Sequence, residues 1–288
     1  MAEGTPRSRR RIGELVRDHW QDGLTHEAVA NAINVKRQTI SRLINGENLV
    51  QWPTVCAVLV ELGAPKEVIK KAKELHEAAA VSMANLEHTR DMPAKYRNFR
   101  LDEREAVKER TLDQSLFPGM LQSPEYAEVC ARAAHRRIKG RAWNEQAAAE
   151  REDRQSILYR DTNPLYLHSL IDISALRKVI GGPEVMSAAL DYLEKAAKRD
   201  NIVVQIIADE VGAYGAHSSP IILLKFDHPK EPRAAFVEGW TGIEQIDWRD
   251  EAALDTLYDV WDDVQQVAMS PDDSLQAIQE QKDRVSRA

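Results

Sequence analysis

The sequence predicts a mainly α N-terminal bundle of five helices, followed by an α+β domain with a small sheet and several helices. Apolar residues recur at helical spacing in the first part of the chain, whereas candidate strands appear only from Leu165 onward. A chain of 288 residues is long enough for about two domains. We therefore expect a helical domain over residues 1–75, a helical connector over 76–98 and an α+β domain over 99–288.

The first three helices have local start and stop signals. The first runs from about Arg11 to Gln21, and Thr25 is placed to cap the second. Asn34 marks a sharp turn, since Asn tolerates the left-handed conformation better than any residue except Gly. A third helix is expected over about Lys36 to Asn45, where Gly46 provides a left-handed stop.

Two further helices complete the predicted bundle. Pro53 fits the first turn of the fourth helix, which Gly63 ends. The fifth begins around Pro65 and continues through an alanine-rich stretch into the connector, and Met92 and Pro93 mark its end.

The stretch Leu24–Gly46, LTHEAVANAINVKRQTISRLING, combines an apolar core, a turn and a polar face. Ala30 is small enough for two helices to cross closely. The polar face consists of residue types that bridge to guanine or adenine edges in a major groove or to flanking phosphates, namely Arg37, Gln38, Ser41 and Arg42. The core is expected to comprise Leu24, Val29, Ile33, Val35, Ile40 and Leu43.

With this motif, the N-terminal region resembles the Xre/Cro-type helix-turn-helix repressor family. The resemblance implies that the second helix of the motif lies in the major groove of a double-stranded DNA operator. It departs from the family pattern at Asn34 for Gly, at Lys36 for a capping Ser or Thr, and at Ile44 for an acid. The alternative is a degenerate bundle used for protein contact. The implied DNA-binding residues are His26, Lys36, Arg37, Gln38, Thr39, Ser41, Arg42 and Asn45.

Charge is distributed unevenly along the chain. Residues 1–75 hold twelve Lys or Arg and nine Asp or Glu, a net charge of +3, so the remaining 213 residues carry −10. Part of the positive charge belongs to a segment expected to precede the first helix. It is either a DNA-binding arm, which neutralises phosphates or enters a minor groove, or a disordered solvated tail. Its arginines are Arg7, Arg9, Arg10 and Arg11.

The C-terminal region alternates short apolar runs with helical patterns. Helices are expected from Ser123 and Pro124 onward, over about Trp143 to Arg160, and after the break at Gly181–Pro183. Two more are expected near the C-terminus, at about Asp250 to Met269 and Asp273 to Arg287. The expected strands are Leu165 to Ile171, Ile202 to Ala208, Ile221 to Phe226 and Ala234 to Val237.

Three further features resemble the DUF5753 domain that follows an Xre-type helix-turn-helix in many actinobacterial regulators. They are Phe117–Ala127 (FPGMLQSPEYA), the set Arg151, Arg154 and Gln155, and Leu176–Met186 (LRKVIGGPEVM). Met120 and Ser123 replace a usual Leu and Thr conservatively. The resemblance implies a transcription regulator, often encoded beside a small partner protein of the DUF397 type.

Catalytic and metal-binding patterns are missing from the sequence. His217 and His228 lie near several acidic residues, but their spacing matches no HExxH, EF-hand or paired-Cys motif, and no phosphate-binding Gly-rich loop is present. We expect no enzymatic activity, no metal and no cofactor. Cys56 and Cys130 are expected to have packing roles. Without an apolar run of 18 residues or a secretory signal, the protein is expected in the cytoplasm, with no membrane partner.

Aromatic residues suggest an effector pocket in the second domain. Trp240 and Trp248 bracket the turn WTGIEQIDW and, with Tyr214, could line it. The alternative is that they fill the seam between sheet and helices. Trp261 is expected in the core or at a dimer contact.

The predicted function is that of a sequence-specific, DNA-binding transcriptional regulator, with repression the favoured sign. It is expected to act as a homodimer on half-sites roughly 34–36 Å apart, with a C-terminal domain that receives a protein or small-molecule signal. The alternative is an antitoxin-like or scaffold protein that mainly binds a small protein partner. An acidic C-terminal domain suits a basic partner.

Overall fold

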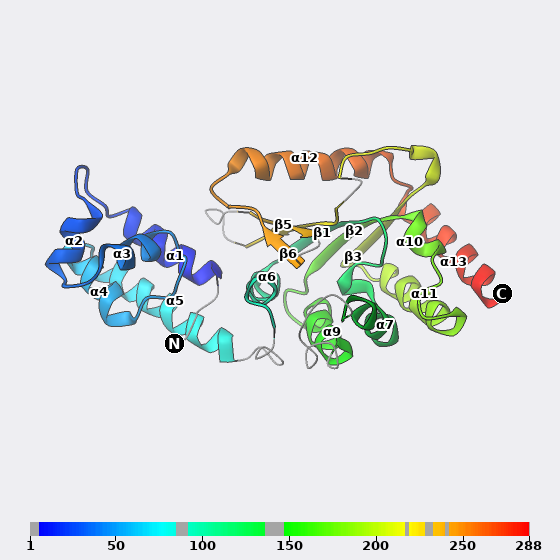
Figure 1. Cartoon of the computed structure of the whole chain (residues 1–288), viewed down its shortest axis with the longest axis horizontal. Coiled ribbons are helices and arrows are strands. Elements are labelled where there is room, and N and C mark those ends of the chain that lie inside the picture. Colours follow the sequence, from blue (N-terminus) through cyan, green and yellow to red (C-terminus); the bar gives the residue numbers. More distant parts are fainter. Residues whose placement is uncertain are drawn as a thin grey trace. The chain divides into compact units, whose positions relative to one another are not determined.

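The computed structural model describes residues 6–84, 92–135, 147–216, 219–227, 233–239 and 242–287 (Figure 1). The chain divides into two compact units, Met1–Leu86 and Glu87–Ala288. The last helix of the first unit reaches Ala84, and the first helix of the second begins at Ala94. The expected connector at 76–98 is therefore shared between the two units.

The first unit is a bundle of the five expected helices. Their bounds are α1 Pro6–Arg17, α2 His26–Ala32, α3 Arg37–Ile44, α4 Trp52–Glu61 and α5 Lys66–Ala84. One apolar cluster fills the bundle, and its fully buried members include Val16, Ile40, Val55, Val58 and Leu59. The sequence thus predicted the number of helices, and helical periodicity predicted buried residues such as Val16, Ile40 and Val55.

Local signals place the helix ends in the motif. The Thr25 hydroxyl accepts a hydrogen bond from Ala28 N at 3.1 Å, as expected for the cap of α2. Asn34 adopts φ 56° at the turn and Gly46 adopts φ 65° after α3. Lys36 makes no side-chain cap bond at the start of α3, as its chemistry requires.

The first helix differs from the prediction at its start. It begins at Pro6 and not near Arg11, so the predicted arm residues belong to α1. Arg9 and Arg10 are 8% and 5% exposed, because this end of α1 packs within the bundle. The expectation of an extended segment before the first helix is therefore wrong for Arg7, Arg9, Arg10 and Arg11.

The second unit is built on a sheet that, within the described residues, has six strands in the order β3-β2-β1-β4-β5-β6. β1 lies parallel to β2, and β2 to β3, while β4, β5 and β6 continue as an antiparallel meander. Thr111 of β1 pairs with Ser169 on one side and Ile222 on the other. The strands are β1 Lys108–Asp113, β2 Tyr166–Asp172, β3 Ile202–Ile207, β4 Ile221–Lys225, β5 Ala234–Gly239 and β6 Gly242–Gln245.

Four of these strands coincide with the predicted ones, but β1 and β6 were missed. β1 has the sequence KERTLD, in which charged residues prevail, although central strands with parallel neighbours are usually apolar throughout. It nevertheless buries Glu109 and Thr111. β6 has only four residues, too few for a period-2 pattern to be distinctive.

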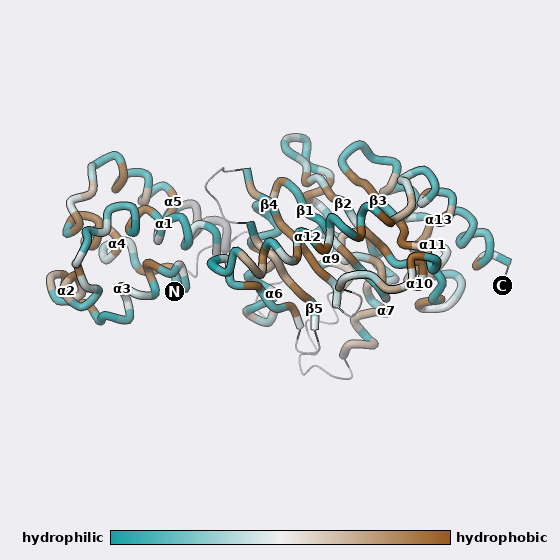
Figure 2. Tube along the Cα trace, turned by 90° about the horizontal axis from the view of Figure 1, so that it is seen from above, coloured by the Kyte–Doolittle hydropathy of each residue, from teal (hydrophilic) through white to brown (hydrophobic). Residues whose placement is uncertain are grey.

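Helices cover both faces of the sheet (Figure 1). α12, Glu251–Val267, lies on one face, and the opposite face carries α6 Ala94–Glu105, α7 Pro124–His135, α9 Ala147–Gln155 and α11 Pro183–Ala197. Short helical turns occur at η1 Gly119–Leu121, η2 Ser156–Tyr159, α10 Ile173–Arg177 and η3 Asp209–Val211. Hydrophobic residues gather along the strands between these layers (Figure 2). Each face therefore has its own buried apolar cluster.

The end of the chain closes the β3 edge of the sheet. Ile206 N donates to Ser274 Oγ at 2.8 Å, and Met269 N donates to Ile206 O at 2.8 Å. α13, Pro271–Ser286, then packs against α11 and contributes Ile278 and Val285 to the larger core. These hydrogen bonds satisfy the backbone N–H and C=O groups of Ile206 at the edge of the sheet, so they are not available for pairing with a strand of another chain.

Candidate functional site

In the first unit, α3 presents the polar face that the motif predicted. Arg37, Gln38 and Arg42 are exposed on α3, whereas Ile40 and Leu43 of the same helix are buried. Lys36 is exposed just before the helix, while Thr39 and Ser41 are half-buried beside them. The structure thus brings these six predicted residues together on one helix and its cap.

α1 fixes the carboxyl end of α3 by a close backbone contact. A Cβ atom on Gly13 would lie 2.5 Å from Ile44 O and 2.8 Å from Leu43 O, closer than van der Waals contact permits. Arg17 Nη1 also donates to Ile44 O at 3.0 Å, which satisfies a carbonyl that the helix leaves unpaired. The orientation of α3 therefore depends on α1.

The side chains of the other two predicted DNA-binding residues contact neighbouring residues of the first unit. His26, the first residue of α2, is half-buried and meets the Trp20 ring edge-on at 5.2 Å between centroids. Asn45 Nδ2 donates to Glu47 Oε1 at 3.0 Å. The arginines that we assigned to a DNA arm lie in α1, and a contact of theirs with DNA stays a prediction.

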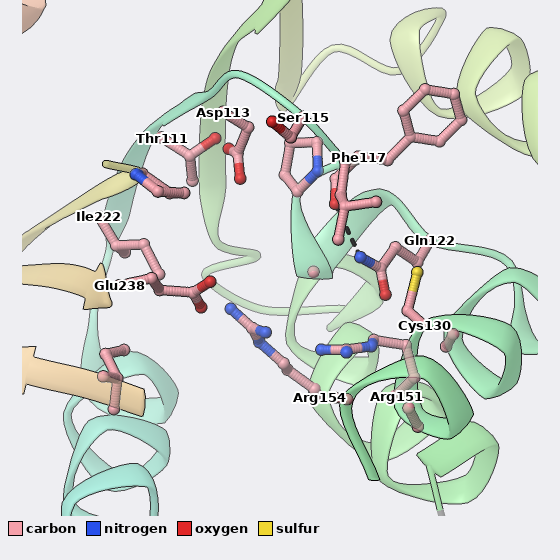
Figure 3. Close-up of a pocket in the computed structure, with 18 of the residues that line it drawn as sticks. Thr111, Asp113, Ser115, Phe117, Gln122, Cys130, Arg151, Arg154, Ile222 and Glu238 are labelled. Atoms are coloured by element: carbon pink, nitrogen blue, oxygen red, sulfur yellow. Dashed lines mark hydrogen bonds between the residues drawn. The ribbon is translucent and has the colours of Figure 1, made fainter. Parts of the chain in front are cut away.

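The second unit contains a cavity of about 440 Å³ at the carboxyl end of β1 (Figure 3). At β1 the sheet changes from a parallel neighbour, β2, to an antiparallel one, β4. Crevices outside the carboxyl ends of strands, at such a change in strand order, are common ligand sites in α/β folds. The loop after β1 and residues of α7, α9, β4, β5 and β6 complete the walls.

One wall carries arginines fixed by a buried ion-pair network. Arg154 Nε donates to both carboxylate oxygens of Glu103, at 2.8 and 2.9 Å, and its guanidinium lies 5.0 Å from the Phe99 ring centroid. Arg100 donates to Glu103 and Glu150. These side chains are 4% exposed or less, so the network is held away from solvent. The result is a rigidly placed guanidinium at the cavity.

Gly119 allows the arginines to approach the loop. A Cβ atom at this position would lie 2.1 Å from Arg154 Nη1 and 2.8 Å from Arg151 Nη1. The residues around it are fixed as well: Phe117 stacks on Tyr126 with centroids 4.9 Å apart, and Gln122 Nε2 donates to Phe117 O at 2.7 Å. A small residue is therefore required where the FPG sequence meets the arginines.

The facing wall is acidic. Asp113 ends β1, Glu238 lies near the end of β5, and both face Arg154 across the cavity (Figure 3). Burial, reinforced by the nearby Glu238 carboxylate, raises the pKa of Asp113 to about 8. Asp113 is therefore largely protonated at neutral pH, when the cavity is empty.

The predicted aromatic pocket does not coincide with this cavity. Tyr214 donates its hydroxyl to Asp172 Oδ2 at 2.8 Å and packs against the core under α12, and Trp248 is half-buried in the turn before α12. Neither lines the cavity, and Trp240 lies outside the described residues. Trp261 is fully buried and donates to Thr111 O at 2.9 Å, so it belongs to the core.

Two sequence features that carry the family resemblance also line the cavity, and they could have predicted its position. The FPGMLQSPEYA stretch and the pair Arg151 and Arg154 meet at the same wall. Their separation of about thirty residues in the chain conceals this, because only the tertiary structure brings α7 and α9 into contact.

Cysteines and metal ligands provide no additional site among the described residues. Cys56 and Cys130 are half-buried thiols, and burial raises the pKa of Cys130 to about 11. Across the described ranges, no three His, Cys, Asp or Glu side chains are placed to hold a metal ion. The same residues include no helix that is long and apolar enough to cross a membrane.

Comparison with known protein families yields two matches. A model described as a helix-turn-helix domain matches residues 7–71, and a model of the domain of unknown function DUF5753 matches residues 96–280. Neither the curated proteins nor the solved structures include a match to this chain.

Proposed function

Because the chain belongs to the DUF5753 family and carries a helix-turn-helix domain ahead of the family's own domain, we propose that it is a sequence-specific transcriptional regulator. In this proposal α3 reads the major groove of an operator. The C-terminal domain receives a protein or small-molecule signal, and neither domain has a catalytic role.

The polar face of α3 carries the proposal. Within the described residues, no hydrogen bond or ion pair occupies the side chains of Arg37, Gln38 or Arg42, so their donors can reach a ligand. Arg presents a bidentate fork to guanine O6 and N7, and Gln can do the same for adenine. A solvated helix face would show the same exposure, but it would not require α1 to fix the end of α3 at Gly13.

We further propose a homodimer that binds a palindromic operator and represses transcription. A single bundle contacts few base pairs, so useful specificity requires two recognition helices about one DNA turn, roughly 34–36 Å, apart. The net charge of +3 over residues 1–75 supports attraction to DNA despite the acidic remainder.

Binding to the protein's own promoter region tests the proposal. The full chain is titrated onto labelled fragments in excess competitor DNA at near-physiological salt. If Arg37 contacts a guanine, Arg37→Ala is expected to weaken specific binding by about 1–3 kcal/mol and to relax preference at one base position. Lys73→Ala is the control, since Lys73 is an exposed cation on α5 paired with Glu77.

Two results would contradict the regulator proposal: no selective binding by the wild-type chain, or equal effects of the Arg37 and Lys73 substitutions on operator choice. The second candidate function is then an antitoxin-like or scaffold protein that holds a small basic partner, such as one of the DUF397 type. The net charge of −10 outside residues 1–75 favours this candidate.

A further inference from the structure

The cavity has an incompletely neutralised basic wall. Arg151 is 16% exposed, its nearest carboxylate oxygen is Glu150 Oε2 at 3.9 Å, and its Nε atom has no hydrogen-bond partner within the described part of the chain. In Arg154, by contrast, Nε and Nη2 both contact the Glu103 carboxylate, and Nη1 lies next to Gly119. A buried guanidinium without a close carboxylate is costly, so this wall is suited to an oxyanion from outside the chain.

Two further buried oxygen atoms at the cavity have no hydrogen-bond partner among the described residues. They are Asp113 Oδ2 and Gln122 Oε1. Gln122 is oriented by its other atom, since Nε2 donates to Phe117 O. The exposed Glu238 carboxylate also lines the cavity and acts electrostatically on Asp113. A cationic ligand group that donates hydrogen bonds would satisfy Gln122 Oε1 and would favour the ionised form of Asp113 over the protonated form of the empty cavity.

Apolar surface lines the rest of the cavity. Leu116, Phe117, Ile222 and Ile243 contribute side chains to it, together with alanines of α7. The volume of about 440 Å³ falls in the ordinary range for small-molecule sites. The lining thus matches a ligand with an apolar part in addition to its two charged ends.

We propose that this cavity binds a small zwitterion of the amino-acid class. Its carboxylate lies against Arg151 and Arg154 Nη1, its ammonium group against Asp113 and Glu238, and its apolar part against Ile222 and Ile243. A phosphate dianion fits less well, because Glu103 already holds one edge of Arg154 and the opposite wall is acidic. This inference rests on the proposed function only in identifying the zwitterion as the regulator's signal.

Calorimetric titration of the dialysed full-length protein tests the site directly. The probes are the twenty standard amino acids together with γ-aminobutyrate and 6-aminohexanoate, which vary the distance between the two charges. For an amino acid that binds, the matched analogues lack either the amine or the carboxylate, as 3-phenylpropionate and phenethylamine do for phenylalanine. At least one zwitterion is expected to bind, and both of its analogues are expected to bind at least tenfold more weakly.

Two variants locate the binding. Arg151→Gln and Glu238→Gln are each expected to lower the affinity for the zwitterion about ten- to a hundredfold, because each variant loses a charged hydrogen bond to the ligand. Arg132→Gln is the matched control, since this exposed arginine of α7 pairs with Glu128 and does not line the cavity. Glu238 is exposed, so its variant is informative even if replacing Arg151 disturbs folding.

The proposal is overturned if no zwitterion of the panel binds the wild-type chain, if an analogue with a single charge binds equally well, or if both cavity variants retain full affinity. Operator binding by the same preparation separates this result from the proposed function. Zwitterion binding without selective DNA binding would support the site and contradict the regulator, and the reverse result would do the opposite.

Discussion

Asp113 shows how a single carboxyl group at the end of a strand acquires unusual chemistry. The Glu238 carboxylate disfavours its ionised form, whereas a hydrogen bond with Thr111 and the charge of Arg154 favour that form. Burial outweighs the favourable effect of Arg154, so the pKa stays raised at about 8. The acidic wall formed by Asp113 and Glu238 therefore gains negative charge as the pH rises through about 8.

A raised pKa makes stability depend on pH at this residue. The folded state binds the Asp113 proton more tightly than the unfolded state, so its contribution is fully present below the unfolded pKa near 4 and is lost as pH rises toward 8. Asp113→Asn removes the titrating group. Urea unfolding measures the free energy of unfolding of this variant and of the wild type at pH 5 and at pH 8. The variant's value minus the wild-type value is expected to be about 1–3 kcal/mol larger at pH 8 than at pH 5.

Asp227→Asn serves as the control for this measurement, because Asp227 is an exposed carboxyl after β4. If the difference between Asp113→Asn and wild type is the same at both pH values, Asp113 does not titrate in this range in the folded protein.

At the scale of elements, α1 acts as a support for α3. Gly13 has no Cβ where Ile44 O and Leu43 O approach. The backbone of Arg10 also approaches Gly46, where an added Cβ would lie 2.9 Å from Arg10 Cα. A glycine inside a helix normally costs stability relative to alanine. Its presence at position 13 is explained by the contact and not by helix propensity.

Gly13→Ala therefore tests the contact with a clear sign. Propensity alone would stabilise the helix by up to about 1 kcal/mol, whereas displacement of the Ile44 carbonyl is expected to destabilise the bundle by about 1–3 kcal/mol. Thermal unfolding of the full chain measures the effect, and operator affinity is expected to fall with it. Asp18→Ala, an exposed position beyond α1, is the control. An unchanged or higher melting temperature for Gly13→Ala would contradict the supporting role of α1.

β1 is the element that organises the second unit. It pairs with β2 and β4, places Asp113 at the cavity and buries Glu109 4.0 Å from Arg154 Nη2. Burial first, and then repulsion by Glu103, raises the pKa of Glu109 well above its ordinary value. A strand this polar is stable at the centre of a sheet only because the neighbouring helices provide charged partners.

For the whole molecule, the two units differ in charge and in expected role. Residues 1–75 carry +3 and the remainder −10, so attraction to DNA is concentrated in the first unit. In the proposed function, DNA binding therefore belongs to the first unit and signal binding to the second.

The proposed dimer gives a prediction at this scale. Sedimentation velocity of the full chain is expected to show a species of twice the chain mass of 32.6 kDa, either free or on operator DNA. Halving the spacing between half-sites is expected to abolish tight binding, because the two recognition helices could no longer reach successive major grooves. A monomer both free and on DNA would exclude the dimer.

The sequence by itself determined the five-helix bundle, the polar face of α3 and four of the strands. Those features depend on local periodicity and on capping or turn residues such as Thr25 and Asn34, which act within one or two turns of chain. Only the tertiary structure decided the position of α1 against α3, the central place of β1 and the location of the cavity. Local sequence patterns do not distinguish Glu109, Arg154 and Gly119 from ordinary polar or small surface residues. Their roles arise from partners distant in sequence, whose charges and backbone offset the cost of burying them.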